Sequence, residues 1–484
     1  MYVNEKIYST LGLNIMTNEQ VERIHSSTLQ VLQRVGVKIF EPEALELLSS
    51  SGAKVDGNLV RIPDWMVHSA LQTAPQSVTL YNLRGSASII LEKGRIHYGA
   101  GSEVPFTIDL VDGRRRKVLS TDVYNSSRLI DSLPHIDFAM SLGLISDVPV
   151  RYSDLYQFEA MLTGTVKPIL FTCYNRKNLQ CIIDMAALTA GSREKLKARP
   201  SVALYAEPTS PLVHSKDAME KMLTCAAEGI PLIYATTPML GATGPVTVAG
   251  SLVVANAEIL SGLVVHQLKA KGAPFVYGGG IPPMHMGTSI CSYGGPERDR
   301  GCIGLVRLSQ YYHLPSFTTA GCTDAHIFDQ QAGMEAGFNL TVAGLAGGNL
   351  IHDLGYMGIG MISSLEYLLL CNEAVGAVKN LLCGIDIDEE HLAVDLIEKV
   401  GPGGHFLAEE HTMKHFRNEL YFPEILNRKN YDSWLADGGK TFGEIANKKV
   451  KMMLDEHRGS ELPPVILQQI RRQVDGLTGE ATTK

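Results

Sequence analysis

The stretch that decides the fold is Asn349–Gly360, "NLIHDLGYMGIG". A short apolar run leads into His352, Asp353 and Tyr356, and glycine-rich sequence follows at once. A run this short, apolar on both faces and closed by polar residues, is typical of a buried parallel strand. The fold class therefore depends on how often this pattern recurs along the chain.

The pattern recurs eight times, and a stretch with helical spacing separates one run from the next. The runs are "RIHYGAG" from Arg95, "HIDFAMSLGL" from His135, "KPILFTCYN" from Lys167, "SVALYAEPTSP" from Ser201, "IPLIYATTPM" from Ile230, "PFVYGGGIPP" from Pro274, "PSFTTAGCTDA" from Pro315 and "NLIHDLGYM" from Asn349. Eight strand–helix repeats predict an α/β fold, a (β/α)8 TIM barrel. An open dinucleotide-binding sheet would need GxGxxG after its first strand, which "YGAGSEVP" does not supply.

The chain before and after the repeats has a different character. Residues 1–85 contain two helical segments and short strands, which predict an N-terminal α+β cap on the barrel of residues 86–385. Residues 386–484 are more charged, and they predict a C-terminal helical extension that wraps the barrel or mediates assembly. We therefore expect three regions in one chain of 484 residues.

Composition excludes several classes of function. A net charge of −8 argues against a nucleic-acid or anionic-membrane binder, because both need a basic face. The densest cationic cluster, residues 114–117, follows the turn signal Asp112-Gly113 and predicts a solvated hairpin tip. We find neither a cationic leader with an apolar core nor an apolar window long enough to span a membrane. The eight cysteines form no CxxC pair, which favours free thiols in the cytoplasm.

In a (β/α)8 barrel the functional residues lie at the carboxyl ends of the strands. Tyrosine recurs at five of the eight predicted strand ends, and neither arginine nor lysine closes any of them. Aromatic rings with acids and no cation predict a site for a positively charged, poorly hydrated ligand. The alternative for each tyrosine is packing within the barrel wall. The predicted substrate-binding residues are Tyr98, Tyr174, Tyr205, Glu207, Tyr277, Gly279 and Tyr356.

Metal chemistry is the competing hypothesis. A metal-dependent barrel hydrolase would need two histidines on the first strand, which offers only His97. His405, His411 and His415 could form a zinc site, but they lack the glutamate of HExxH and lie outside the barrel repeats. Capping and interhelical hydrogen bonds are the favoured role for these histidines, and we expect no metal.

Five longer segments carry a resemblance to a known family: "RVGVKIF" (34–40), "IPDWMVHSALQTAPQSVTLYNLRG" (62–85), "YGAGSEVP" (98–105), "AGCTDAHIFDQQAGMEA" (320–336) and "GPGGHFLAEEHTMKHFRNE" (401–419). Across them the chain resembles the trimethylamine methyltransferase (MttB) family over nearly its whole length. The resemblance implies a barrel that moves a methyl group from a methylated amine to the Co(I) centre of a separate corrinoid protein. The corrinoid belongs to that partner, so we expect no tightly bound cofactor in this chain.

The resemblance also narrows the substrate. Family members that act on trimethylamine carry a pyrrolysine in the barrel, whereas this chain contains only the twenty standard residues. It therefore resembles the non-pyrrolysine branch, whose substrates are quaternary amines. Glycine betaine is the first expectation, and proline betaine, carnitine and γ-butyrobetaine are the alternatives. A hypothesis from another class is a quaternary-amine-binding sensor that has lost the chemistry.

This interpretation assigns roles to the remaining candidates. We expect His352 and Glu103 to be catalytic, with His352 holding the substrate in line or acting near the cobalt. Gly355, Gly358 and Asp324 would face the corrinoid, because small residues let a flat cofactor approach closely. With no arginine at the strand ends, backbone N–H groups of 278–280 or 241–244 would bind a substrate carboxylate. We also expect a homo-oligomer.

Overall fold

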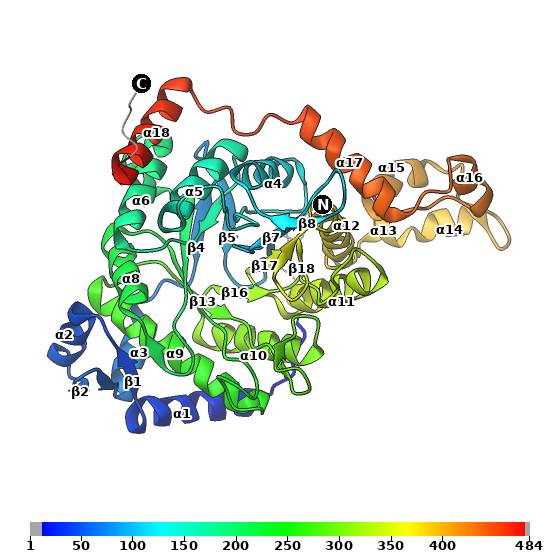
Figure 1. Ribbon diagram of the computed structural model, residues 1–484. Helices are drawn as coiled ribbons and strands as arrows, with labels where there is room; N and C mark the ends of the chain where they lie inside the picture. The colour runs from blue at the N-terminus through cyan, green and yellow to red at the C-terminus, as the bar shows by residue number, and fades with distance from the viewer. Residues whose placement is uncertain (1–11, 480–484) are drawn as a thin grey trace.

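The computed structural model describes residues 12–479, so the prediction about an N-terminal leader falls mostly on residues outside this range. Seven parallel strands form a curled sheet in the order β6-β17-β16-β13-β12-β10-β9 (Figure 1). They are β6 His97–Ala100, β9 Ile169–Phe171, β10 Val202–Ala206, β12 Leu232–Thr236, β13 Phe275–Gly279, β16 Ser316–Thr319 and β17 Leu350–Leu354. The predicted α/β barrel class is confirmed.

The eighth position in the barrel is filled by a short segment with strand-like pairing. Phe138 pairs in parallel with Gly99, and Ala139 pairs in parallel with Ile169. These two bridges connect β6 to β9 and close the ring. The Phe138 ring occupies the space over Gly99, where a Cβ would lie 2.2 Å from the ring. The second predicted strand is thus reduced to a pair of bridges by this close packing.

Helices surround the sheet. The outer layer consists of α4 Ser120–Ser132, α5 Ser153–Gly164, α6 Arg176–Ala190, α7 Arg193–Ala198, α8 Lys216–Glu228, α9 Val248–Lys269, α10 Pro296–Tyr312, α11 Gln330–Ala346 and α12 Leu365–Leu381. Side-chain caps start several of them, including Asn175 on α6 and Ser215 on α8. Helix α9 is long and apolar enough to span a membrane, but it packs among α1, α3, α8, α10 and the sheet. Burial in the barrel wall explains its composition.

Strand residues alternate between the barrel interior and the surrounding helices. Leu170, Ala203, Ile233, Val276 and Phe317 meet in one buried cluster inside the barrel. The residues between them along each strand join the cluster shared with the helices, as Phe171 and Phe275 do. This alternation decides which side chains can reach the strand-end cavity.

The N-terminal region packs on α9 and closes the lower end of the barrel. Its elements are α1 Asn18–Arg34, β1 Val37–Ile39, α2 Pro42–Ser50, β2 Lys54–Asp56, β3 Leu59–Arg61, α3 Asp64–Thr73, β4 Val78–Tyr81 and β5 Ala87–Leu91. Val78, Leu80, Ile89 and Leu91 of the antiparallel β4–β5 hairpin are buried in the same cluster as the barrel interior. The hairpin therefore seals the floor of the barrel. The predicted boundary after residue 85 falls in its turn, and the division into three regions stays a prediction.

Short strands build the rim at the other end. They are β7 Phe106–Ile108, β8 Arg115–Lys117, β14 Met284–His285, β15 Ile290–Cys291, β18 Tyr356–Met357 and β19 Ile362–Ser363; away from them, β11 Val213–His214 pairs with β1. Strands β7 and β8 form an antiparallel hairpin at the predicted cationic turn. There Arg116 pairs with Asp109 at 2.8 Å and with Asp122 at 2.6 Å. Arg116 of the cluster thus lies on a hairpin strand and is paired with two acids.

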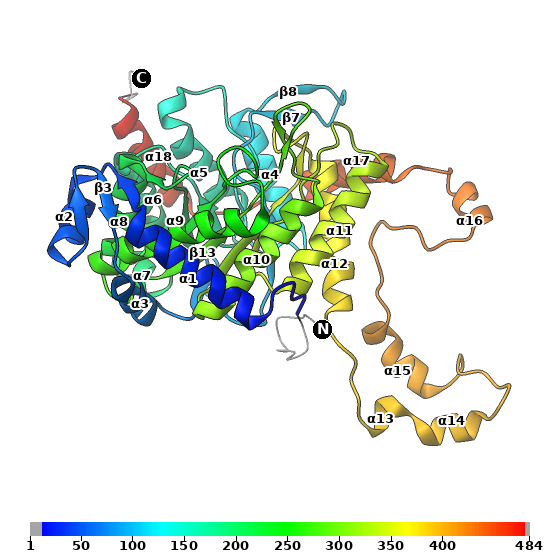
Figure 2. The ribbon, with the colours of Figure 1, turned by 90° about the horizontal axis from the view of Figure 1, so that it is seen from below.

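The C-terminal region has two parts. Helix α17 Phe442–Glu456 packs against α4 and α12, and α18 Pro464–Thr478 packs against α5 and α6. Before them, α13 Glu389–Leu392, α14 Val394–Val400, α15 Glu410–Glu419 and α16 Tyr431–Ala436 stand away from the barrel (Figures 1 and 2). Among the helices described after α12, α17 and α18 are therefore the ones that wrap the barrel.

Candidate active site

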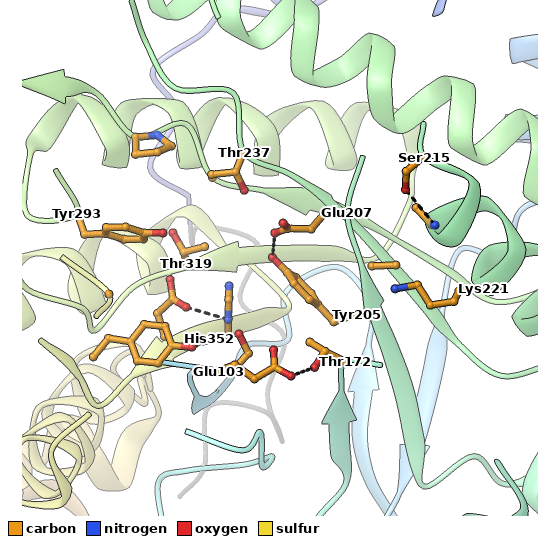
Figure 3. A pocket seen from close by; sticks show the side chains of 18 of the residues that line it. Glu103, Thr172, Tyr205, Glu207, Ser215, Lys221, Thr237, Tyr293, Thr319 and His352 are labelled. Carbon is orange, nitrogen blue, oxygen red and sulfur yellow. Dashed lines mark hydrogen bonds and ion pairs between the residues drawn. The ribbon is translucent and has the colours of Figure 1, made fainter. Parts of the chain in front are cut away.

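A cavity of about 460 Å³ opens at the carboxyl ends of the strands (Figure 3). Strands β10, β16 and β17 contribute to its wall, together with the segments after β6, β9, β12 and β13, helix α8 and the start of α10. The size is within the range of about 300–1,000 Å³ that is usual for small-molecule sites. The location is the one that the barrel fold predicts for an active site.

Strand β10 points two side chains into the cavity. Tyr205 and Glu207 are two residues apart and therefore on the same side of the strand. The Tyr205 hydroxyl donates a hydrogen bond to Glu207 Oε1. Glu207 is exposed to the cavity, yet protein surrounds it, and this loss of solvation raises the pKa of its carboxyl group, while the Tyr205 hydrogen bond partly offsets the effect.

A second carboxyl group, Glu103, follows strand β6. Its Oε1 accepts hydrogen bonds from Thr172 Oγ1 and from Gln157 Nε2, the latter at 3.2 Å. Burial raises the pKa of Glu103, and these two hydrogen bonds lower it in part. Figure 3 shows Glu103 and Glu207 approaching the cavity from different sides of Tyr205. The cavity thus holds two acids that lack full solvation, and a bound cation would favour their charged forms.

The end of β17 carries His352 and, next to it, Asp353, whose backbone is strained. Asp353 has φ +81°, a conformation that residues with a side chain rarely adopt, at a shift in register between β17 and β6. The His352 ring stacks on Phe317 with centroids 4.2 Å apart. Its Nδ1 lies 3.0 Å from Asp353 Oδ1, but neither ring nitrogen has an aligned hydrogen-bond partner among residues 12–479. A buried imidazole in this state has hydrogen-bonding capacity left for a ligand.

Behind this pair lies a buried guanidinium. Arg298, in the first turn of α10, places Nη2 2.5 Å from Thr319 Oγ1 and 3.5 Å from Asp353 Oδ2. Its Nη1 donates to the backbone oxygen of Tyr293 at 2.9 Å, and the guanidinium lies over the Tyr293 ring. Arg298 therefore balances the charge of Asp353 and holds Tyr293 at the cavity wall.

Helix α8 brings a second cation. Lys221 lines the cavity and donates from Nζ to the Cys173 backbone oxygen at 2.8 Å. Ser215, the capping residue of α8, lines the same wall. The sequence analysis expected a site without cations, because it considered only strand ends, and this expectation is wrong. The N-terminal parts of barrel helices also border the cavity, and both cations come from the first two turns of such helices.

Six of the predicted site residues line the cavity. They are Glu103, Tyr174, Tyr205, Glu207, His352 and Tyr356. Tyr174 lies at the mouth, where 59% of it is exposed, and the Tyr356 hydroxyl donates to Ser102 Oγ at 3.1 Å inside. Tyr293, which the sequence analysis missed, follows the β14–β15 hairpin and lines the cavity as well.

Three predicted substrate-binding residues do not line the cavity. The Tyr98 hydroxyl donates to the Leu340 backbone oxygen of α11 at 2.9 Å, and the Tyr277 hydroxyl donates to Asn256 Oδ1 of α9 at 2.8 Å. Both tyrosines occupy the outward positions of their strands. At Gly279 a Cβ would lie 2.0 Å from a backbone oxygen of β12, so this glycine permits close strand pairing.

The residues predicted to face the corrinoid are also enclosed by protein. A Cβ on Gly355 would meet Leu142 at 3.0 Å, and one on Gly358 would meet Ile362 at 2.9 Å. The Asp324 carboxylate accepts a hydrogen bond from Ser292 Oγ at 2.5 Å and one from the Tyr293 backbone N–H at 2.7 Å. None of the three lines the cavity. Asp324 instead fixes the loop that carries Tyr293.

The histidines of the C-terminal region lie far from this cavity along the chain. The rings of His411 and His415 are tilted against each other with centroids 4.4 Å apart, and His415 Nε2 lies 2.9 Å from Glu390 Oε1. Among residues 12–479 we find no group of three histidine, cysteine, aspartate or glutamate side chains arranged to hold a metal ion. The cluster links α13 to α15 through polar contacts.

The fold can be compared with solved structures. The crystal structure of the monomethylamine methyltransferase MtmB from Methanosarcina barkeri superposes with a TM-score of 0.52 at 10% identity, covering 93% of this chain and 90% of that one. At this identity the likeness concerns the fold alone, and it agrees with the barrel described above.

The chain belongs to the trimethylamine methyltransferase (MTTB) family, whose sequence profile matches residues 4–479. It is 34% identical to a trimethylamine methyltransferase MttB of Desulfitobacterium hafniense, over 96% of this chain and 94% of the relative. It is 30% identical to a glycine betaine methyltransferase of another strain of that species, over 88% of this chain and 89% of the relative. The MttB of Methanosarcina thermophila is 31% identical, over 95% and 96% of the two chains.

Proposed function

We propose that this protein transfers a methyl group from a quaternary amine, glycine betaine first, to the Co(I) centre of a separate corrinoid protein. The observation that carries the proposal is the cavity itself, in which the acids Glu103 and Glu207 and the rings of Tyr205 and Tyr356 line one space. A relative named for glycine betaine methyl transfer and a sequence of standard residues alone support the quaternary substrate.

The reaction needs little acid–base chemistry from the protein. The Co(I) electron pair forms a bond to the methyl carbon, and the carbon–nitrogen bond breaks with its electrons left on nitrogen. The products are methyl-Co(III) and a neutral tertiary amine, so no proton is required to release the leaving group. The protein must desolvate the cation and fix the direction of one methyl group.

The cavity residues fit these tasks. Glu103 and Glu207 counter the positive charge, and each ring contact with a quaternary ammonium contributes about 0.5–2 kcal/mol, depending on desolvation. His352 and Tyr205, whose rings lie 5.7 Å apart, form a wall against which the trimethylammonium group is held. We assign His352 the positioning of the substrate.

The substrate carboxylate needs a donor of its own. Lys221 and the N-terminal end of α8 at Ser215 provide positive potential on one wall of the cavity. These residues replace the backbone N–H groups of 278–280 and 241–244 as our candidates for binding the carboxylate, because Gly280 is the one residue of those two segments that lines the cavity. At about 460 Å³ the cavity also has room for carnitine, γ-butyrobetaine or proline betaine, which are the second candidates.

The methyl acceptor must reach the cavity from outside. Exposed apolar side chains follow several strand ends around the mouth: Tyr174 (59%), Val246 (63%), Met286 (59%), Ile290 (49%) and Met361 (48%). Such a rim suits a protein partner that brings a large, flat cofactor. We therefore propose that the corrinoid stays with its own protein and that this chain holds no tightly bound cofactor.

All eight cysteines are free thiols, which supports a cytoplasmic location.

The test is spectroscopic. The protein is mixed with a cognate Co(I) corrinoid protein and with glycine betaine, proline betaine, carnitine, γ-butyrobetaine or trimethylamine. We expect the Co(I) band to disappear and methyl-Co(III) to grow with one betaine and not with trimethylamine. Methylation with trimethylamine alone would contradict the proposal. Betaine binding by calorimetry without any methylation would instead favour the sensor hypothesis.

A further inference from the structure

One half of the cavity mouth carries exposed cations from three segments of the chain. They come from the β7–β8 hairpin, from the short 3₁₀ turn η2 Val150–Tyr152 and from the first turn of α6. The six exposed residues, which we call the cationic rim, are Arg114, Arg115, Lys117, Arg151, Arg176 and Lys177. The whole chain has a net charge of −8, so this local charge is opposite in sign to that of the molecule.

The three segments lie next to one another at the carboxyl ends of the strands. The Ser146 backbone N–H, before η2, donates to the Val118 oxygen at the base of the hairpin at 2.9 Å. The Asn178 side chain of α6 donates to the Arg151 backbone oxygen at 2.9 Å. Tyr174, at the cavity mouth, comes just before α6, and Figure 2 shows the hairpin at the edge of the barrel. The cationic rim is therefore a continuous edge beside the entrance.

Few acids compensate this charge. Between residues 104 and 177, all of them described, the exposed acids are Asp112 and Asp147. Asp112 lies 3.9 Å from Arg114, whose side chain is 85% exposed, and Asp147 accepts hydrogen bonds from the start of α4. The guanidinium groups of Arg115 and Arg151 lie over neighbouring aromatic rings, at 4.2 and 4.8 Å from the centroids. A positive potential thus remains along this edge.

The small substrate does not account for the cationic rim. Glycine betaine and the other candidate betaines carry one positive and one negative charge each, so a field of one sign gives them no net attraction. Such a field raises the rate of encounter with a molecule of opposite net charge. The cationic rim is therefore suited to a larger, acidic partner that approaches the mouth.

We propose that the cationic rim docks an acidic surface of the corrinoid protein beside the entrance to the cavity. The identity of this partner rests on the proposed function. The partner must bind and leave in every methyl transfer, and charges at the edge of an interface act mainly on the association rate. Val111, 87% exposed, and Val150, 65% exposed, lie beside the cations and provide apolar contact area. A nucleic acid is a poorer occupant, because the net charge of −8 repels a long polyanion.

The first experiment measures how fast the full-length protein associates with the cognate corrinoid protein, by biolayer interferometry at low and at physiological salt. At low salt the hairpin variant Arg114→Glu/Lys117→Glu and the helix variant Arg176→Glu/Lys177→Glu should each associate about tenfold more slowly than the natural protein. The difference should shrink as salt screens the charges. Association of the natural protein that does not depend on salt, or folded variants that associate at its rate, would overturn the proposal.

Two controls separate the position of the charges from their number. Arg199→Glu/Lys271→Glu changes the net charge by the same amount at the opposite end of the barrel, since these exposed residues precede β10 and β13. Arg114→Lys/Lys117→Arg keeps both charges of the hairpin. Both controls should associate at the natural rate, and melting temperatures report whether each variant is folded. A far-end control as slow as the hairpin variant would assign the effect to total charge and overturn the proposal.

The second experiment separates docking from the reaction. Methyl-Co(III) formation is followed with saturating betaine while the concentration of the corrinoid protein varies. The hairpin variant should raise KM for the corrinoid protein about tenfold and leave kcat and calorimetric betaine affinity unchanged. A lower kcat with an unchanged KM would mean that the hairpin acts on the cavity, and it would overturn the proposal.

The two inferences fail in different ways. If the natural protein methylates no corrinoid with any betaine, the proposed reaction is wrong, while the association rates still decide whether the cationic rim docks the corrinoid protein. An RNA oligonucleotide of mixed sequence tests the other class of partner by the same method. RNA binding that the hairpin variant loses, with corrinoid-protein association unchanged, would assign the rim to nucleic acid and overturn the proposal.

Discussion

Two groups of carboxylates in this barrel share the same chemistry and have different roles. Glu258 of α9 and Glu103 at the cavity each accept a hydrogen bond from a threonine hydroxyl, and burial raises the pKa of both. Glu258 is completely buried and also accepts from Ser210 Oγ at 2.9 Å and from the Leu212 backbone N–H at 2.8 Å. Its hydrogen-bonding capacity is largely used within the protein.

The cavity acids are less well satisfied. Glu103 accepts from two side chains through one oxygen, and within residues 12–479 the hydrogen bond that Glu207 accepts comes from Tyr205. Loss of solvation without full internal compensation is a feature of binding sites, whereas Glu258 has the compensation of a structural group. The comparison teaches that a raised pKa alone does not identify a functional acid. A carboxylate that faces a cavity and lacks hydrogen-bond donors from the protein is the better indicator.

The largest effect is expected from removing both cavity charges. Glu103→Gln/Glu207→Gln keeps the shapes of the side chains but leaves a desolvated cation without its counter-charges, which should lower kcat/KM for methyl transfer about 1,000-fold. The measurement is the rate of methyl-Co(III) formation. The melting temperature of the double variant should stay close to that of the natural protein. A double variant with nearly full activity would mean that Glu103 and Glu207 have no functional role that distinguishes them from Glu258.

Glu258→Ala should act on stability instead. The substitution removes the acceptor of three donors, of which Thr236 is fully buried and Ser210 and Leu212 are half-buried, and the expected loss of unfolding free energy is about 3 kcal/mol. Denaturant unfolding measures this loss, and calorimetry on the folded fraction should find betaine affinity unchanged. If the affinity fell as far as in the cavity variants, Glu258 would belong to the site.

The pH dependence of betaine binding tests whether the charged forms of the cavity acids Glu103 and Glu207 are needed. Binding requires their charged forms, and burial places the pKa of Glu103 and of Glu207 above the ordinary value. Affinity should therefore be full above these raised pKa values and should decline as the pH falls through them, earlier than for a solvated glutamate. Calorimetry in two buffers should also detect proton release on binding. Affinity independent of pH down to the ordinary range would contradict this.

A smaller effect is expected on the opposite wall. Lys221→Met removes the cation proposed for the substrate carboxylate, and we expect about tenfold weaker binding of glycine betaine. Tetramethylammonium, which has no carboxylate, should bind the variant as well as it binds the natural protein. Equal losses for both ligands would mean that Lys221 supports the cavity without recognising the carboxylate.

The sequence predicted the barrel because eight buried strands with helices between them leave a strong and regular pattern. It could not show that the second strand is only a pair of bridges, since that depends on how Phe138 packs over Gly99. The site was predicted in part. The position at strand ends was enough to predict Glu103 and Glu207 as site residues. The side-chain direction of Tyr98 and Tyr277 depends on strand register, and the alternation of inward and outward residues could have indicated it.

Residues that the sequence analysis missed come from another level of structure. Arg298 and Lys221 reach the cavity from the N-terminal parts of helices α10 and α8, and Tyr293 reaches it from a loop held by Asp324. Their positions depend on how helices and loops pack on the barrel, and no local pattern reports that. The glycines at 355 and 358 show the converse, because a local pattern suggested an open mouth where the fold uses them for tight packing.

The sealed floor of the barrel has a consequence for the order of events. Because the β4–β5 hairpin fills the lower end, the cavity has its entrance at the strand-end mouth. Under the proposed reaction, small amine and corrinoid protein must share that doorway. The amine has to enter first, and the demethylated product can leave only after the corrinoid protein has departed. Turnover then follows a compulsory binding order. A surplus of corrinoid protein slows the enzyme, because it covers the entrance of a cavity that holds no amine.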